Sequence, residues 1–252
     1  MNGLSRWWRN RRLQRHLITQ PEFESACARL PILRGLTANE RHRLREQTSL
    51  LIADKTFSAA GDAEVSQATR LAVALQACLL TLHLDERSYR GWHEIILYPD
   101  EFMRQREERD DAGVVHVTRD ILSGEAWHGG PLVLSISDVF ASGQADGFNV
   151  VLHEFAHKLD MLNGEANGFP PLHHGMHAAT WKHDFSSAYE DLCKRVDAGD
   201  DTEIDAYATH SPAEFFAVLT EVFFETPVML LNSYPAVYAQ MKAFYRQDPL
   251  TR

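Results

Sequence analysis

The chain has 252 residues, of which 44% are hydrophobic, and it carries a formal net charge of −10. This size and apolar content are enough for a substantial buried core, whereas the acidic balance gives no electrostatic footprint for direct nucleic-acid binding. No stretch approaches the roughly 20 consecutive apolar residues that a membrane span needs.

The basic N-terminus and the cysteines bear on the cellular location of the protein. The first 20 residues are rich in arginine and tryptophan, but no apolar core or small-residue cleavage site of a secretory signal follows. A surface helix explains this segment most simply, and an arm that binds a membrane surface or a partner is the alternative. Cys27, Cys78 and Cys193 form no CxxC pair, which indicates buried thiols rather than a disulfide framework. We therefore expect a cytoplasmic protein.

The first third of the chain has the apolar spacing of helices, at residues 21–30, 38–54 and 65–84. Thr37 and Glu40 have the spacing of a capping box, which predicts that the second of these helices begins after Thr37. We expect residues 1–85 to form a helical region that packs on a catalytic part at residues 86–252, as one continuous structural unit.

The middle of the chain has the composition of short strands, at residues 92–98, 114–119 and 131–137. The charged run 104–111 is predicted to be a solvated loop between two of them. Helical spacing then returns around residue 153 and at residues 178–197, 212–224 and 236–245. Helices, a small mixed sheet and further helices predict an α+β fold that is mostly helical.

The sequence His153-Glu154-Phe155-Ala156-His157 carries the chemistry. Two histidines four residues apart share one face of a helix and can bind one metal ion, while Glu154 can act on a water there as a general base. This HExxH pattern is typical of zinc metallopeptidases. Apolar flanking residues predict a largely buried helix that Asn163-Gly164 ends as a left-handed cap. The alternative is a pair of core histidines that only form hydrogen bonds.

The predicted strand 131–137 comes shortly before the motif helix. A strand beside a metal-binding helix can offer its free edge to an extended peptide, through main-chain hydrogen bonds. It can equally be an ordinary core strand, and both interpretations stay open.

A catalytic zinc site needs a third protein ligand. The candidates that follow the motif are Asp160, His173, His174, His177, His210, Glu214, Glu221 and Glu225. Asp160 shares the helix face of His157, but its short side chain suits it better to orient a ligand's imidazole. The three histidines at 173–177 lie in a loop with Gly and Pro and are predicted to be exposed.

Glu214 is the strongest candidate, ahead of Glu221 two helical turns later. Ser211, Pro212 and Glu214 also fit a capping box, which would account for this carboxylate without any metal. The strongly apolar residues that follow nevertheless predict a buried helix, in which a cation is the natural partner of a glutamate in the first turn.

Three segments together resemble the MtfA (Mlc titration factor A) family of bacterial zinc peptidases, namely residues 153–160, 204–208 and 211–217. The members of this family are gluzincins similar to the catalytic domain of anthrax lethal factor. The resemblance is specific over residues 132–245 and implies a zincin-like fold. It implies zinc bound by His153, His157 and Glu214, Glu154 as the base, and Tyr207 as the group that stabilises the oxyanion.

The resemblance also implies aminopeptidase activity and a protein partner, the transcriptional repressor Mlc. Lethal factor has a further glutamate where this chain has Val218, so Asp160 and Glu221 are the candidates for supporting the ligands. Glu221, Asp160 and Asp205 are candidates for holding a substrate's amino group. Two alternatives remain: a non-catalytic protein that sequesters the repressor and has a structural zinc site, and a zinc hydrolase of non-peptide amides.

Overall fold

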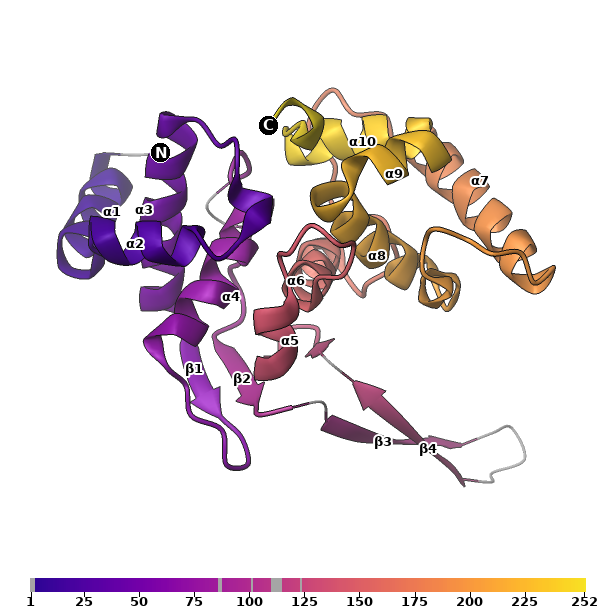
Figure 1. Ribbon diagram of the computed structural model, residues 1–252, viewed down its shortest axis with the longest axis horizontal. Coiled ribbons are helices and arrows are strands. Elements are labelled where there is room, and N and C mark those ends of the chain that lie inside the picture. The colour runs from indigo at the N-terminus through magenta and orange to yellow at the C-terminus, as the bar shows by residue number, and fades with distance from the viewer. Residues whose placement is uncertain (1–2, 86–87, 101, 110–114, 123) are drawn as a thin grey trace.

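A computed structural model describes residues 3–85, 88–100, 102–109, 115–122 and 124–252 (Figure 1). It is mostly helical and contains a small mixed sheet, which confirms the predicted α+β class. In Figure 1 the N-terminal helices and the C-terminal helices lie on opposite sides of a central pair, α5 and α6. Among these described residues, no helix has the length and apolarity required to cross a membrane.

The N-terminal side is built from α1 (Gly3–His16), α2 (Gln20–Cys27), α3 (Ala38–Asp54) and α4 (Gln67–Leu80). The predicted bounds of α3 are confirmed, because both hydrogen bonds of the Thr37–Glu40 capping box are present. The helices expected at 21–30 and 65–84 are confirmed in shorter form. Residues 71–80 of α4 are all buried, so this helix forms the centre of the core on this side.

The main sheet has the strand order β1-β2-β6-β5, with β1 (Thr56–Ala59), β2 (Glu94–Tyr98), β6 (Leu132–Ser135) and β5 (Gly124–Ala126). The first three strands are parallel, and β5 is antiparallel to β6. Of the two interpretations of residues 131–137, the structure supports the core strand, because β6 has a neighbouring strand on each side and β5 forms the edge beyond it. The strand also ends early, since the Ser135 hydroxyl accepts from Asp138 N and starts α5 (Ile136–Ala141).

A separate antiparallel hairpin is formed by β3 (Phe102–Arg109) and β4 (Val115–Leu122). It extends away from the helices at the lower right of Figure 1. The loop predicted at 104–111 is wrong for residues 104–109, and residues 110–111 lie outside the described residues, as does residue 114 of the predicted strand. The ladder of an antiparallel pair is formed by the backbone, so a charged sequence does not prevent it.

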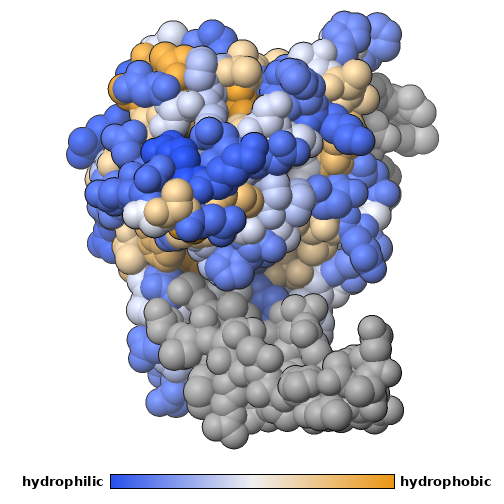
Figure 2. All heavy atoms as spheres, turned by 90° about the vertical axis from the view of Figure 1, so that its right-hand side faces the viewer, coloured by the Kyte–Doolittle hydropathy of each residue, from blue (hydrophilic) through white to orange (hydrophobic). Residues whose placement is uncertain are grey.

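The C-terminal side contains α6 (Val150–Asp160), α7 (Ala178–Asp197), α8 (Pro212–Glu225), α9 (Pro227–Ser233) and α10 (Pro235–Tyr245). The helix α6 packs against α4 on one side and α8 on the other. It ends three residues before the predicted cap, because Met161–Asn163 form a 3-10 turn and Gly164 (φ 149°) follows that turn. Seen from the side of α7 and α10, the surface is mostly hydrophilic, with hydrophobic residues in small groups (Figure 2).

One continuous cluster of buried apolar residues runs from Ile18 to Tyr245. The sheet also takes β1 from the region before residue 85 and its other strands from the region after it. The division into residues 1–85 and 86–252 stays a prediction.

Candidate metal centre

The two motif histidines lie one turn apart on α6, and the centroids of their rings are 4.9 Å apart. Their side chains are largely buried, with 12% of His153 and 9% of His157 exposed. Asn149 caps the helix, because its side chain accepts from Leu152 N at 2.9 Å. The fold thus holds both imidazoles on a buried helix face directed at α8.

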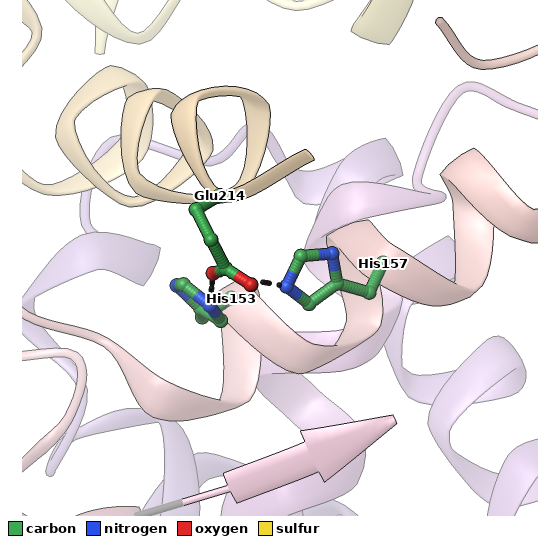
Figure 3. A group of neighbouring side chains, drawn as sticks. All are labelled: His153, His157 and Glu214. Carbon is green, nitrogen blue, oxygen red and sulfur yellow. Dashed lines mark hydrogen bonds and ion pairs between the residues drawn. The ribbon is translucent and has the colours of Figure 1, made fainter. Parts of the chain in front are cut away.

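Glu214 reaches this pair from the first turn of α8 (Figure 3). Its Oε2 lies 3.0 Å from Nε2 of His153 and 3.4 Å from Nε2 of His157. One ligand atom from each of the three residues lies within 4.8 Å of the others. Ser211 accepts from Glu214 N at 3.1 Å, but the Glu214 carboxylate faces the imidazoles. Helix capping and a carboxylate directed at the histidines therefore coexist.

The charges at this point are strongly coupled. Burial opposes ionisation of Glu214, but hydrogen bonds from His153 and His157 hold the pKa of Glu214 well below its ordinary value. Burial likewise disfavours the charged form of His153, yet hydrogen bonds to Glu214 and Glu221 raise the pKa of His153 well above its ordinary value. Both nitrogens of this ring face carboxylates, so the position between Nε2 and Glu214 favours a cation.

Glu221 fixes the orientation of His153 from the other side of the ring. Its Oε1 accepts from His153 Nδ1 at 2.8 Å, and its Oε2 accepts from Asn149 N at 2.5 Å. A hydrogen bond at Nδ1 leaves Nε2 as the nitrogen that can bind a metal. Glu221 therefore orients His153, the supporting role for which the sequence made it a candidate, and it is not part of the group of three residues that could hold a metal.

Glu225 lies one turn further along α8 and has a different set of partners. It accepts from Gly143 N at 3.0 Å, from Ala145 N at 2.5 Å and from Asn149 Nδ2 at 2.6 Å. Burial raises the pKa of Glu225 to about 7. This carboxylate holds the loop before α6 and does not touch either histidine.

Glu154 is buried beside the first residue of β5. A Cβ atom on Gly124 would lie 2.5 Å from Glu154 Cγ and 2.7 Å from its Oε1, so only glycine leaves room for this carboxylate. Burial raises the pKa of Glu154 to about 7, against the charges of His153 and His157. Within the described ranges, its Oε2 has no hydrogen-bond partner. A buried carboxylate with an unpaired oxygen and a pKa near neutrality suits a general base.

Asp160 lies at the end of α6 and holds a loop instead of a histidine. Its Oδ2 accepts from Asn167 N at 2.7 Å and from Gly168 N at 2.6 Å. In the part of the chain that the structure describes, neither its Oδ1 nor Nδ1 of His157 has a partner. Gly168 in turn lies against the carbonyl of Pro212, so Asp160 also helps to place the start of α8.

Tyr207 lies in the 3-10 turn Ala206–Thr209, where Asp205 accepts from its backbone N–H. It is 40% exposed, and its ring centroid is 6.1 Å from that of His153. Its ring also lies 4.7 Å from His210, whose Nδ1 donates to the Tyr207 carbonyl at 2.8 Å. An exposed phenol thus lies beside His153 at the candidate metal centre.

The other candidate histidines lie elsewhere. His174 and His177 are exposed, as predicted, whereas His173 is half-buried because its Nε2 donates to the Phe244 carbonyl at 2.7 Å. The exposure prediction is thus wrong for His173. Sequence reasoning missed three residues that border the site, namely Gly124, Asn149 and Lys158. A charged residue beside His157 within an apolar helix is the one signal that could have indicated Lys158.

A separate cavity of about 410 Å³ lies between α2, α4 and α5. Leu30, Leu71, Val139 and Phe140 are among the side chains that line it, and Arg29 lies at its border. None of the three residues of the metal site lines this cavity. This part of the molecule therefore has a largely apolar hollow apart from the HExxH helix.

Known proteins are similar to this sequence over most of its length. Mlc titration factor A of Klebsiella pneumoniae is 38% identical over 232 residues, which cover 91% of this chain and 87% of that protein. Mlc titration factor A of Escherichia fergusonii is 38% identical over 234 residues, with 92% and 88% covered. A family model described as glucose-regulated metallo-peptidase M90 matches residues 4–246. The chain belongs to this metallopeptidase family, which confirms the resemblance to MtfA proteins.

Proposed function

We propose that His153, His157 and Glu214 hold a zinc ion and that the protein is a zinc peptidase. The observation that carries the proposal is the approach of one Glu214 oxygen to Nε2 of both histidines. Two imidazoles and one carboxylate form a ligand set of catalytic zinc sites. The buried position between them favours a cation and so fits a metal. The Nδ1 atom of His153 is already hydrogen-bonded to Glu221, which leaves its Nε2 for the metal.

Glu154 is the group that moves the proton. A zinc ion would lower the pKa of a water and polarise the scissile carbonyl. Glu154 takes the proton from the attacking water and delivers it to the departing amine, because its pKa of about 7 allows both transfers near neutral pH. The Tyr207 hydroxyl donates a hydrogen bond to the oxyanion, a contribution on the order of 3 kcal/mol for one well-placed donor.

The substrate in this proposal is an extended peptide that lies along β5. Within the described residues, β5 is the last strand of the sheet beyond β6, so a substrate strand can be added along its outer edge. Its first residue, Gly124, is in contact with Glu154, so a peptide on this edge would reach the base. This is the substrate role that the sequence suggested for the neighbouring strand.

Aminopeptidase activity requires a carboxylate for the substrate's amino group. The three candidates from the sequence are engaged elsewhere, since Glu221 binds His153, Asp160 binds a loop and Asp205 binds Tyr207 N. Glu125 on β5 is a further candidate for this role on grounds of proximity, because its charge contributes to raising the pKa of Glu154, after burial and Glu214. Glu125→Gln should raise KM for aminoacyl amides and leave KM for N-acetylated peptides unchanged.

The test of the peptidase proposal is Glu154→Gln in the zinc-loaded protein. This variant should keep one zinc per chain and lose hydrolysis of peptidyl and aminoacyl amides, and a chelator should stop hydrolysis by the native chain. Full activity in Glu154→Gln would refute the assigned base. Cleavage restricted to non-peptide amides would support the alternative zinc hydrolase.

A protein partner of the Mlc repressor type is the second part of the proposal. It is supported by the name of the relatives, Mlc titration factor A. The apolar cavity between α2, α4 and α5 provides a surface apart from the metal site, which favours two separable functions. Glu154→Gln should then bind purified repressor with native affinity in calorimetry. Binding in a native protein that cleaves no substrate would instead favour a non-catalytic sequestering protein.

We also propose a cytoplasmic location for this work. It is supported by the free thiols Cys27 and Cys78, which are buried, and by Cys193, which is partly buried.

A further inference from the structure

The helix α6 carries a second pair of side chains four residues apart, Glu154 and Lys158. Residues with this spacing lie one turn apart on the same helix face. The histidine pair faces Glu214 on α8, whereas Glu154 and Lys158 face β5 and the turn that follows it. The proposed chemistry uses Glu154 and leaves Lys158 without a role.

Lys158 is buried, with 4% of its surface exposed. Its ammonium donates to the carbonyls of Trp127 at 2.7 Å, Gly130 at 2.9 Å and Pro131 at 3.3 Å. An ammonium has three N–H donors, so each of them has an acceptor here. A buried cation is tolerated only with such complete pairing. All three carbonyls belong to the turn between β5 and β6.

This turn is folded so that its carbonyls converge on one cation. Trp127 N donates to the Pro131 carbonyl at 3.2 Å, and Gly130 N donates to the Trp127 carbonyl at 3.1 Å. Gly129 has φ +64°, the left-handed conformation that glycine adopts without strain. Lys158 also lies 4.8 Å from the centroid of the Trp92 ring, which limits its freedom to move.

The edge strand is thus in contact with α6 at both ends: Gly124 lies against Glu154, and the turn after β5 is bound by Lys158. We infer that Lys158 is a positioning residue that fixes β5 at the separation from Glu154 at which a bound peptide meets the base. The inference rests on the proposed peptidase function and on β5 as the substrate strand.

Lys55 offers a matched control. It is equally buried, at 5% exposed, and its ammonium donates to the carbonyls of Tyr89 and Trp92, both at 2.6 Å. It lies 4.1 Å from the centroid of the same Trp92 ring. Its carbonyl partners precede β2 and are not part of β5 or its turn. Lys55 also has an ion-pair partner, since Asp54 Oδ2 lies 3.4 Å from its ammonium. Lys55→Met and Lys158→Met therefore both remove a buried ammonium that binds backbone carbonyls beside Trp92.

The experiment compares Lys158→Met, Lys158→Gln and Lys55→Met in the full-length, zinc-loaded protein. It measures bound zinc, thermal unfolding, hydrogen exchange at the amides of Trp127 and Gly130, and KM and kcat for a peptide substrate. Lys158→Met should keep one zinc per chain, speed exchange at both amides at least tenfold and raise KM at least tenfold. Lys158→Gln retains amide donors and should lie between, whereas Lys55→Met should keep native exchange and KM.

Native exchange and native KM in Lys158→Met would overturn the inference, as would equal changes in Lys55→Met. If neither Lys158 variant folds, the native protein decides, because slow exchange at Trp127 and Gly130 supports the role and rapid exchange overturns it. A native protein without peptidase activity would refute the proposed function, while the exchange measurements would still test whether Lys158 holds β5.

Discussion

Glu221 allows a quantitative test of how the site is supported. Its carboxylate accepts one hydrogen bond from His153 Nδ1 at 2.8 Å and another from Asn149 N at 2.5 Å. A glutamine has a single acceptor oxygen, so it can keep only one of these bonds. A bond to a charged group contributes about 1.5–3 kcal/mol and a neutral one about 1 kcal/mol, so Glu221→Gln should lose on the order of 1–2 kcal/mol at His153. We expect the affinity for zinc to fall about 10- to 100-fold.

The assay is competition for zinc against a chromophoric chelator, with thermal unfolding measured with and without zinc. Glu225→Gln is the control, because Glu225 lies one turn away on α8 and is also buried but does not contact a histidine. Glu225→Gln should lower the melting temperature and change the zinc affinity less than threefold. Native zinc affinity in a folded Glu221→Gln protein would refute the assigned support of His153.

Three further perturbations test separate parts of the site. The pKa of His153 is raised well above its ordinary value, and zinc binds only the neutral ring, so one proton should leave as zinc binds. The apparent zinc affinity should therefore rise about tenfold per pH unit from pH 6 upward. A zinc affinity that does not change between pH 6 and pH 8 would contradict this. Gly124→Ala should fold and bind zinc but lose about 100-fold in kcat, since its Cβ would displace Glu154; unchanged kcat would show that the base has room to spare. Gly168→Ala should lower both the melting temperature and the zinc affinity. Residue 168 has φ +76°, and the Cβ of an alanine there would lie 2.4 Å from the Pro212 carbonyl oxygen. Calorimetry and chelator competition should show both losses, and native values would contradict the packing argument.

Elements with their own local signals could be predicted from the sequence. Helix α3 begins where Thr37 and Glu40 form a capping box, and α7 has the predicted bounds 178–197. The histidine pair is equally local, because its four-residue spacing needs only a helix. Such features depend on neighbours within about one turn, and these neighbours are visible in the sequence.

Features that depend on distant contacts could not be predicted in the same way. The strand β5 has three residues and is defined by its pairing with β6, and β3 is a charged segment whose partner supplies its hydrogen bonds. Glu214 is 61 residues from His153, so the choice between a capping-box side chain and a histidine partner could be weighed but not decided from sequence. The room that Gly124 leaves for Glu154 is visible only once β5 and α6 are packed together.

A single buried helix can therefore organise both the metal and the substrate. Since 3.6 residues complete a turn, two pairs at spacing four that are offset by one residue point about 100° apart. In α6 the offset directs His153 and His157 toward α8, and Glu154 and Lys158 toward β5. In the proposed mechanism, Glu154 thus lies between the two histidines and the edge strand and is not itself a metal ligand. Any shift of α6 would move the two histidines and Glu154 together, so the helix sets their relative geometry. Glu214 and β5 lie on other elements, and Asp160, Glu221 and Lys158 align them with α6.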